Sequence, residues 1–292
     1  MSMNSSINIA MIIKLFAILP LSFLLEGVFR KLLARMQNRV GPSILQPFYD
    51  GFKLFKKSKN DSRGQKNIFF KLFPFLYFLA SYSLFLFLLG AVYFHLDFIF
   101  FIYMIMVISL IYILLGLVSN SPFGTIGSMR EMLLNICYDV VFMICILTIF
   151  VYSGVLTIKE FTQNLLIIKL PLAGLCMITV AIIETRILGF DVEGTEPEII
   201  SGIYTEYSGK DLFFIESANH VRLLFCIILL TKFLFNPVGI LSFIIVFSLL
   251  FFIIAFSRMI SAKPRTDQTF NLLVILLLFS VIEFIRIHFL VW

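Results

Sequence analysis

The 292-residue chain is 60% hydrophobic and only 14% charged, and its mean hydropathy is +1.03. Soluble domains carry about a quarter charged residues, so this composition excludes an ordinary soluble enzyme and indicates a polytopic membrane protein. The net charge of +6 does not indicate nucleic-acid binding, because positive residues beside membrane spans are required for topology.

Eight apolar segments are each long enough to cross a bilayer, which takes about twenty apolar residues. The first begins near Ile7, and no small-residue cleavage site follows it, so we expect a permanent helix rather than a signal peptide. Segment 156–169 is too short to span and is expected at the outer surface. We predict an all-α membrane protein with one membrane domain over residues 1–292. Its spans are expected at about 7–29, 72–94, 98–118, 132–153, 170–188, 218–235, 238–257 and 270–291.

The placement of Lys and Arg predicts the orientation of these spans. With an even number of spans, both termini lie on one side and the basic loop 30–71 lies on the other, together with most of the remaining Lys and Arg. The positive-inside rule then puts both termini outside and the two large loops, 30–71 and 189–217, in the cytoplasm. We therefore expect a multi-pass protein of the cell membrane.

The first cytoplasmic loop contains an expected amphipathic surface helix at 43–57. Phe residues recur there at helical spacing with Lys residues beside them, which is typical of a helix lying among lipid headgroups. Two interpretations stay open, namely a simple lipid anchor, or a helix that shapes a docking surface or a cavity entrance. The residues concerned are Phe48, Phe52, Phe55, Lys53, Lys56 and Lys57.

Ionisable residues within apolar spans are candidates for chemistry, because an Asp at the centre of a spanning helix costs about 2.5–3.5 kcal/mol. Glu26, Asp139 and Glu184 have apolar neighbours on both sides. They suit a proton-carrying role between helices, whereas Glu216 and Arg222 fit a structural ion pair at the end of a span. Burial and like charge let such carboxyls change protonation state near neutrality.

The loop FDVEGTEPEIISGIYTEYSG (190–209) carries carboxylates and no basic residue. An acidic loop is usually a solvated surface. This one, however, follows Glu184 and leads to Glu216, so carboxylates can line a path from the surface to membrane depth. Its Gly and Pro residues predict irregular backbone, which is tolerated near membrane depth only when protein covers it or it lines a cavity. We therefore expect a partner to cover this loop.

The four Cys residues form no CxxC motif and the three His residues lie far apart in the sequence. We expect no metal and no cofactor bound by this chain alone.

Three segments carry a family resemblance. The run EGVFRKLLARMQNRVGPSILQPFYDGFKL (26–54) resembles the signature of the quinone-site membrane subunit of respiratory complex I and its homologues, and the acidic loop and Glu184 also resemble that family. The loop departs from the family pattern at Gly194, where an acid is usual, and at Gly189, where a proline is usual. The segment NSPFGTIGSMREMLLN (120–135) resembles the membrane-anchor subunit of group 4 membrane-bound [NiFe]-hydrogenases more than complex I proper.

The resemblance implies eight transmembrane helices with additional surface helices. It implies a subunit, without a catalytic metal of its own, of a redox-driven ion-translocating oxidoreductase. Such a subunit anchors soluble hydrogenase-like large and small subunits, which carry [4Fe–4S] clusters and a [NiFe] site, and contacts antiporter-like membrane subunits. Ion coupling is then expected at Glu26, Glu131, Asp139, Glu184, Asp191, Glu196, Glu198 and Glu206. Partner docking is expected at Arg35, Gln37, Arg39, Gln46, Asp50, Lys53, Arg130 and Tyr207.

Three functions follow from these observations. The first is the anchoring and coupling subunit of an energy-converting hydrogenase-type complex that moves H⁺ or Na⁺. The second is a quinone-binding subunit of a complex I-like oxidoreductase with NADH or ferredoxin as donor, its quinone cavity near 34–57 and 190–209. The third, of a different class, is a stand-alone ion transporter, against which the lack of a sequence repeat argues.

Overall fold

A computed structural model of the chain describes residues 9–58, 68–90, 97–154, 165–185, 202–260 and 266–291. All regular structure in these ranges is helical, with no strand among them. The elements are α1 (Ile9–Met36), α2 (Gln46–Lys56), α3 (Ile68–Leu88), α4 (Asp97–Val118), α5 (Pro122–Ser153), α6 (Leu166–Lys169), α7 (Pro171–Glu184), η2 (Gly202–Glu206), α9 (Lys210–Leu230), η3 (Thr231–Phe235), α10 (Ile240–Ile260) and α11 (Thr266–Val291).

Six helices in the described ranges are long and apolar enough to cross a membrane. They are Ile68–Leu88, Phe98–Val118, Pro122–Ser153, Lys210–Phe235, Ile240–Ile260 and Asp267–Phe289, and they correspond to six of the eight expected spans. The other two segments are also helical. Helix α1 has 28 residues, but its second half is charged, and α7 has 14 residues, fewer than the twenty or so that a perpendicular crossing needs. The count of eight spans therefore stays a prediction.

Two helices begin well before the predicted spans. Helix α5 begins at Pro122 rather than near 132, because Ser121 caps it, its Oγ accepting a hydrogen bond from the Gly124 N–H at 3.0 Å. Helix α9 begins at Lys210 rather than near 218. Its far end passes into the π-helical turn η3 and stops at Asn236, whose φ is 38°. The boundary expected between the spans 218–235 and 238–257 is therefore confirmed.

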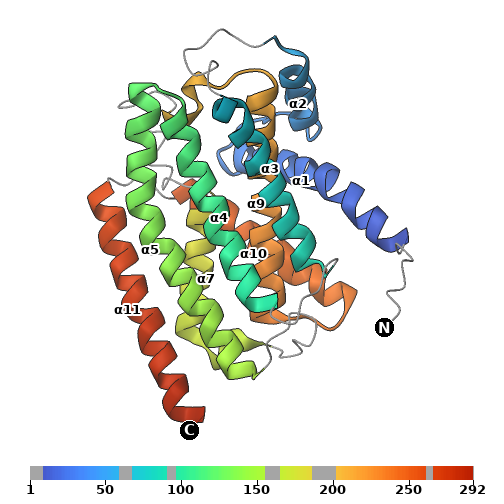
Figure 1. Ribbon diagram of the computed structural model, residues 1–292. Helices are drawn as coiled ribbons and strands as arrows, with labels where there is room; N and C mark the ends of the chain where they lie inside the picture. Colours follow the sequence, from blue (N-terminus) through green and yellow to red (C-terminus); the bar gives the residue numbers. More distant parts are fainter. Residues whose placement is uncertain are drawn as a thin grey trace, which may run out of the picture.

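The helices α3, α4, α5, α7 and α9 run side by side, as Figure 1 shows. Helix α11 lies along α5 and contacts α7, while α1 crosses obliquely on the other side of the bundle, against α9 and α10. The short helix α2 covers the end of the bundle where α9 begins and contacts both α1 and α9. We call this end of the molecule the α2 end.

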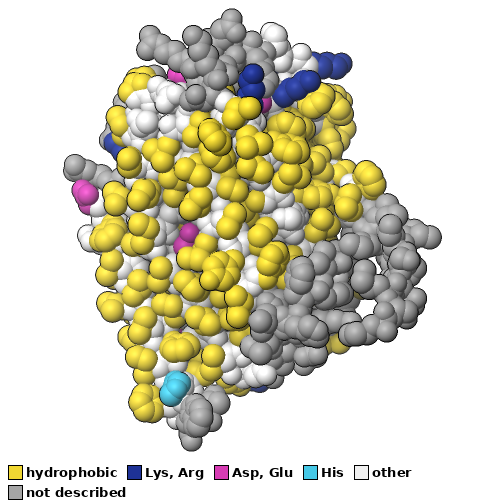
Figure 2. Space-filling view, in the orientation of Figure 1, with side chains coloured by type: hydrophobic (Ala, Val, Ile, Leu, Met, Phe, Trp, Pro, Cys, Tyr) yellow, Lys and Arg dark blue, Asp and Glu magenta, His cyan; other side chains and the backbone are white. Residues whose placement is uncertain are grey.

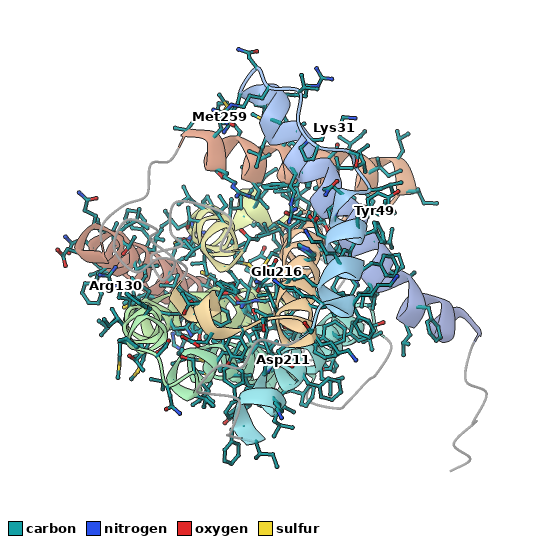
Figure 3. The ribbon with its side chains drawn as sticks, turned by 90° about the horizontal axis from the view of Figure 1, so that it is seen from above. Lys31, Tyr49, Arg130, Asp211, Glu216 and Met259 are labelled. Carbon is teal, nitrogen blue, oxygen red and sulfur yellow. The ribbon has the colours of Figure 1, made fainter. Side chains whose placement is uncertain are left out.

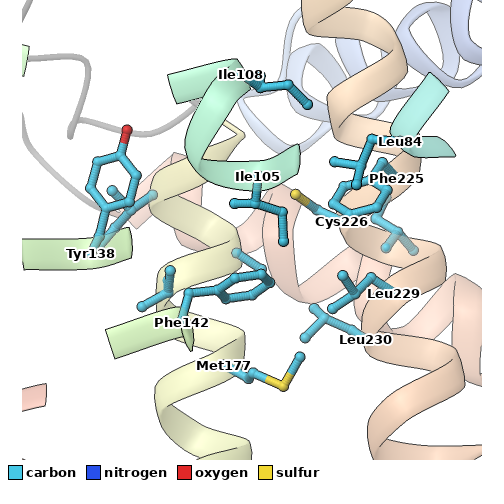
Figure 4. Packing of buried hydrophobic residues seen from close by; sticks show 14 of the residues in the cluster. Leu84, Ile105, Ile108, Tyr138, Phe142, Met177, Phe225, Cys226, Leu229 and Leu230 are labelled. Atoms are coloured by element: carbon cyan, nitrogen blue, oxygen red, sulfur yellow. The ribbon is translucent and has the colours of Figure 1, made fainter. Parts of the chain in front are cut away.

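Apolar side chains from α1, α3, α4, α5, α7, α9, α10 and α11 fill the interior. Figure 4 shows the middle of this packing, where Ile105 of α4, Phe142 of α5, Met177 of α7 and Leu229 of α9 meet. The outside is also apolar over most of its height, and Lys and Arg gather near α2 (Figure 2). Apolar side chains therefore fill the interior and also form most of the outer surface. Such an outer surface is suited to contact with hydrocarbon rather than with water.

Candidate functional site

A first polar cluster joins α1, α2 and α9 at the α2 end. Glu26 is buried and accepts a hydrogen bond from Arg30 Nε at 2.8 Å, one turn along α1. Arg30 Nη1 also reaches Asp50 Oδ2 at 3.2 Å, and Asp50 Oδ1 accepts from Gln46 Nε2 at 3.0 Å. The signature segment 26–54 therefore folds back on itself, and the charges of Glu26, Arg30 and Asp50 pair between α1 and α2.

Helix α9 contributes Glu216 and His220 to this cluster, four residues apart and so on one face. Both side chains interact electrostatically with Glu26, Arg30 and Asp50. Glu216 lies near the centre of the bundle when the molecule is seen from the α2 end (Figure 3). We call Glu26, Arg30, Gln46, Asp50, Glu216 and His220 the α2-end cluster.

An aromatic cavity of about 250 Å³ lies beside the α2-end cluster. The ring of Phe23 packs edge-on against His220 with centroids 5.0 Å apart, so the cavity and the cluster share a wall. Gly51 lets the rings of Phe23 and Phe213 approach the backbone of α2 at this cavity, since a Cβ there would lie 3.0 Å from Phe23 and 3.2 Å from Phe213. Its lining is Leu19, Phe23, Phe48, Gly51, Phe52, Phe55 and Phe213.

A second polar cluster lies deeper, between α3, α7, α9 and η2. Arg222 is buried, pairs with Glu184 through Nη2, and donates from Nη1 to Tyr77 Oη at 2.7 Å. Tyr77 in turn donates to Asn219 Oδ1 at 2.9 Å, and Asn219 Nδ2 donates to Tyr204 Oη at 2.9 Å. These contacts connect the inner end of α7 with η2 in one unbroken hydrogen-bonded chain. We call its five residues, Glu184, Arg222, Tyr77, Asn219 and Tyr204, the relay.

Two further carboxyls on α5 lie near the relay. Asp139 accepts a hydrogen bond from Ser109 Oγ of α4 at 3.2 Å, and its charge interacts with that of Glu184. Glu131 is buried and accepts from Tyr138 Oη at 2.9 Å. Asp139 and Glu184 therefore both interact with the buried guanidinium of Arg222, while Glu131 is bonded to Tyr138 on the same helix as Asp139.

The arrangement is suited to moving a positive charge or a proton. One oxygen of Glu184, Oε2, is buried without a hydrogen-bond partner within the described residues. A buried carboxylate oxygen in this state carries a desolvation cost that a proton or a cation removes. Ionisable side chains at membrane depth are rare and typically line ion or proton paths.

Comparison with known proteins identifies the family. Residues 7–288 match the family model described as NADH dehydrogenase. The chain belongs to the NADH dehydrogenase family. The predicted resemblance to the complex I membrane subunit is thereby confirmed.

Two relatives represent two branches of that family. An NADH-quinone oxidoreductase subunit of Helicobacter acinonychis (strain Sheeba) is 29% identical over 221 residues, which are 66% of this chain and 67% of the relative. Hydrogenase-4 component C of Escherichia coli (strain K12) is 30% identical over 207 residues, covering 67% of this chain and 65% of the relative. The matched regions therefore span about two thirds of these proteins.

A solved structure shows the same fold over nearly the whole chain. It is a chain of the membrane-bound sulfane sulfur reductase, described as an archaeal respiratory membrane complex. The TM-score is 0.80 over 95% of this chain and 98% of that chain, at 18% sequence identity. The fold of this NADH dehydrogenase family member is thus one that occurs in a multisubunit membrane assembly.

The remaining predicted ion-coupling residues and Tyr207 either fall outside the described residues or lie apart from both clusters. Asp191, Glu196 and Glu198 fall outside the described residues, and so does the acidic loop up to Ser201. Glu206 is half-buried in η2. Tyr207 is buried, stacks on Phe70 with centroids 4.4 Å apart and donates to the Leu115 carbonyl at 2.8 Å. Burial and the charge of Asp211 raise the pKa of Tyr207, so it stays a hydrogen-bond donor.

The residues expected to dock a partner divide into two groups. Arg35, Gln37, Arg39 and Lys53 are exposed at the α2 end, and Arg130 lies at the rim of the bundle beside α11 (Figure 3). Gln46 and Asp50 belong to the α2-end cluster instead. The interpretation of Arg222 as a residue at a span end paired with Glu216 is wrong, because packing of α9 against α7 buries Arg222 against Glu184.

The sequence reasoning missed the neutral members of the relay. Charged side chains alone do not reveal this chain of hydrogen bonds, because Tyr77, Asn219 and Tyr204 link them through hydroxyl and amide groups. Tyr and Asn within predicted spans were the available signal, since a buried polar group in an apolar bundle needs a partner.

Proposed function

We propose that this chain is the membrane-anchoring and coupling subunit of a multisubunit energy-converting hydrogenase-type complex. In this role it links electron transfer in a soluble arm to translocation of H⁺ or Na⁺ across the cell membrane. The observation that carries the proposal is the relay, an unbroken chain of hydrogen bonds from Glu184 to Tyr204 inside an apolar helix bundle.

A purely structural function explains the relay poorly. Replacing a buried ion pair by well-packed apolar side chains is often neutral or stabilising by about 1–4 kcal/mol, so an anchor would be at least as stable without the pair. A buried pair with further acids around it is useful where charge must enter and leave. Asp139 and Glu131 supply such acids.

The soluble partner is proposed to dock at the α2 end. The exposed Arg35, Arg39 and Lys53 offer positive charge there, and the α2-end cluster lies directly beneath α2. The partner would carry the [4Fe–4S] clusters and the [NiFe] site, while antiporter-like subunits would adjoin the membrane helices. Similarity to hydrogenase-4 component C of Escherichia coli supports this branch. Both termini are proposed to lie outside the cytoplasm, with eight spans in total.

The test is Glu184→Gln in the assembled complex, reconstituted in vesicles and driven by reduced ferredoxin or viologen. We expect the ions moved per electron to fall severalfold, because a glutamine binds no proton and removes the negative partner of Arg222. The matched control is Asp267→Asn, an exposed carboxyl at the first turn of α11, which should pump normally. An unchanged ratio in Glu184→Gln would reject the coupling role.

The aromatic cavity supports a second candidate function, a quinone-binding subunit of a complex I-like oxidoreductase. Its lining is apolar, as a lipid quinone requires, and the polar α2-end cluster at its wall offers hydrogen bonds to a quinone head. Purified complex assayed with quinone and with viologen separates the two candidates. Co-purified quinone together with quinone-dependent turnover would favour the second function, and hydrogen formation without quinone would favour the first.

A further inference from the structure

A buried carboxyl far from both polar clusters remains to be explained. The side chain of Glu283, on α11, is 0% exposed. Its Oε1 accepts a hydrogen bond from Arg286 Nη2 at 2.6 Å, while its Oε2 is buried without a hydrogen-bond partner in the described part of the chain. The same feature distinguishes Glu184.

Arg286 connects Glu283 to the molecular surface. Its side chain is 42% exposed, and the same Nη2 also donates to the carbonyl of Lys169 at 2.8 Å, where α6 gives way to α7. The ammonium of Lys169 lies over the ring of Tyr152, 5.6 Å from its centroid. Glu283 therefore lies one helical turn from an exposed cation, in the half of α11 that leads to the C-terminus marked in Figure 1.

Two thiols lie on the inner side of Glu283. Cys145 of α5 and Cys176 of α7 are in hydrogen-bond contact, and both feel the charge of Glu283. Cys176 Sγ also donates to the Leu276 carbonyl of α11 at 3.4 Å. Among the described residues, the groups that interact with Glu283 are thus two thiols on α5 and α7 and the guanidinium on its own helix.

The thiol pair lies between Glu283 and the carboxyls near the relay. Cys145 follows Asp139 by six residues on α5, which is about 9 Å of helix. Cys176 precedes Glu184 by eight residues on α7, or about 12 Å. On the α9 side the interior is closed by apolar packing, as Figure 4 shows around Phe225 and Leu230. The two thiols thus extend polar groups beside this packing, between α5, α7 and α11.

We propose that Glu283 is a proton-exchange site that serves the side of the membrane opposite the α2 end. An ionised carboxylate with a buried unpaired oxygen carries a desolvation cost, and taking up a proton removes it. A proton fits better than a metal ion, because no group of three or more His, Cys, Asp or Glu that could hold a metal occurs among the described residues. In this proposal the exposed side of Arg286 provides the contact with water. The proposal rests on the proposed function, because the site would complete its ion path.

Chemical labelling tests the site in the unmodified protein. The assembled complex in sealed vesicles is treated with dicyclohexylcarbodiimide, which reacts with protonated carboxyls in apolar surroundings, and labelled peptides are mapped by mass spectrometry. We expect modification of Glu283 that decreases at least threefold when the pH is raised on the side facing the C-terminal end of α11, with no effect of the same pH change on the α2 side. Absence of label, or control from the α2 side, would overturn the proposal.

Sodium ions and one variant complete the test. Protection of Glu283 by Na⁺ at constant pH would overturn its assignment to protons. The Glu283→Gln variant should lower the ions moved per electron at least fivefold, while Asp267→Asn on the same helix should leave that ratio unchanged. If Glu184→Gln lowers pumping and Glu283→Gln does not, this site is rejected and the coupling role stands. If Glu283 is labelled as expected but Glu184→Gln pumps normally, the coupling role fails separately.

Discussion

The buried pair of Arg222 and Glu184 gives the sharpest prediction about stability. Their side chains are 4% and 12% exposed, so neither charge can turn to water or to lipid headgroups without moving a helix. Replacing Arg222 by Met removes the hydrogen bonds to Tyr77 and to Glu184. It also leaves Glu184 as a buried charge whose second oxygen already lacks a partner in the described structure.

The expected loss follows from these contacts. Breaking a buried ion pair on one side costs about 3–5 kcal/mol, and two hydrogen bonds to a charged group, at about 1.5–3 kcal/mol each, give a similar figure. The free energy of unfolding of Arg222→Met should therefore fall by about 3–5 kcal/mol. The double variant Arg222→Met with Glu184→Leu should recover most of the loss, because no unpaired charge remains.

Equilibrium unfolding of the purified chain in mixed micelles measures these values. The control is Arg258→Met, since Arg258 is exposed and lies over the ring of Phe29 at 5.6 Å, a contact worth about 0.5–1 kcal/mol. A loss below about 1 kcal/mol in Arg222→Met would refute the reasoning. A double variant as unstable as the sum of the two single variants would also refute it, because the two side chains would then not be coupled.

Substitutions at three other positions test separate parts of the structure. Tyr77→Phe removes the hydroxyl in the middle of the relay and should lower the free energy of unfolding by about 1–2 kcal/mol in the same micelle assay. An unchanged value would mean that the hydrogen bonds of this hydroxyl to Asn219 and Arg222 are not formed. Gly51→Val places side-chain atoms against Phe23, so it should fill the aromatic cavity and lower the free energy of unfolding by about 1–3 kcal/mol. It should also abolish any quinone binding measured by titration. Full retention of quinone binding would exclude this cavity as the site. Ser121→Ala removes the hydrogen bond that caps the Gly124 N–H and should lower the free energy of unfolding by about 1 kcal/mol. Ser121→Asp should retain most of the stability, because Asp also caps helices. Equal stability of Ser121→Ala and the unsubstituted chain would argue against the cap.

Much of the helix order was predictable, because long apolar runs have few alternatives in a chain of this composition. The segment around Phe48 and Phe52 was predicted as a surface helix from helical spacing alone, and the structure has α2 there. The predicted first residues of the helices were less accurate. The apolar composition of a segment marks the part that spans the membrane and does not mark the polar first turns of the helix. The Ser121–Pro122 pair was the local signal for the start of α5, and it was read only as part of a family motif.

The candidate site was predictable in its parts but not in its connections. Glu26 and Glu184 were chosen because each is an acid in an apolar run. Their partners could not be derived in the same way, since Arg222 is 38 residues from Glu184 and Asp50 is 20 residues from Arg30. The pairing of these charges depends on how α7 and α2 pack against their neighbouring helices. A single sequence carries no direct signal for that packing.

Helix α9 is the element that joins the two clusters. Glu216 and His220 face α1 and α2, whereas Asn219 and Arg222, within the same two turns, face α3 and α7. Since a helix moves as a rigid unit over two turns, any shift or rotation of α9 changes both sets of contacts at once. In the proposed function, a partner that presses on α2 would therefore act on Glu184 through a single helix, without a separate path of side chains. This geometry accounts for a docking surface and a relay occurring in one subunit that holds no redox centre of its own in the proposed function.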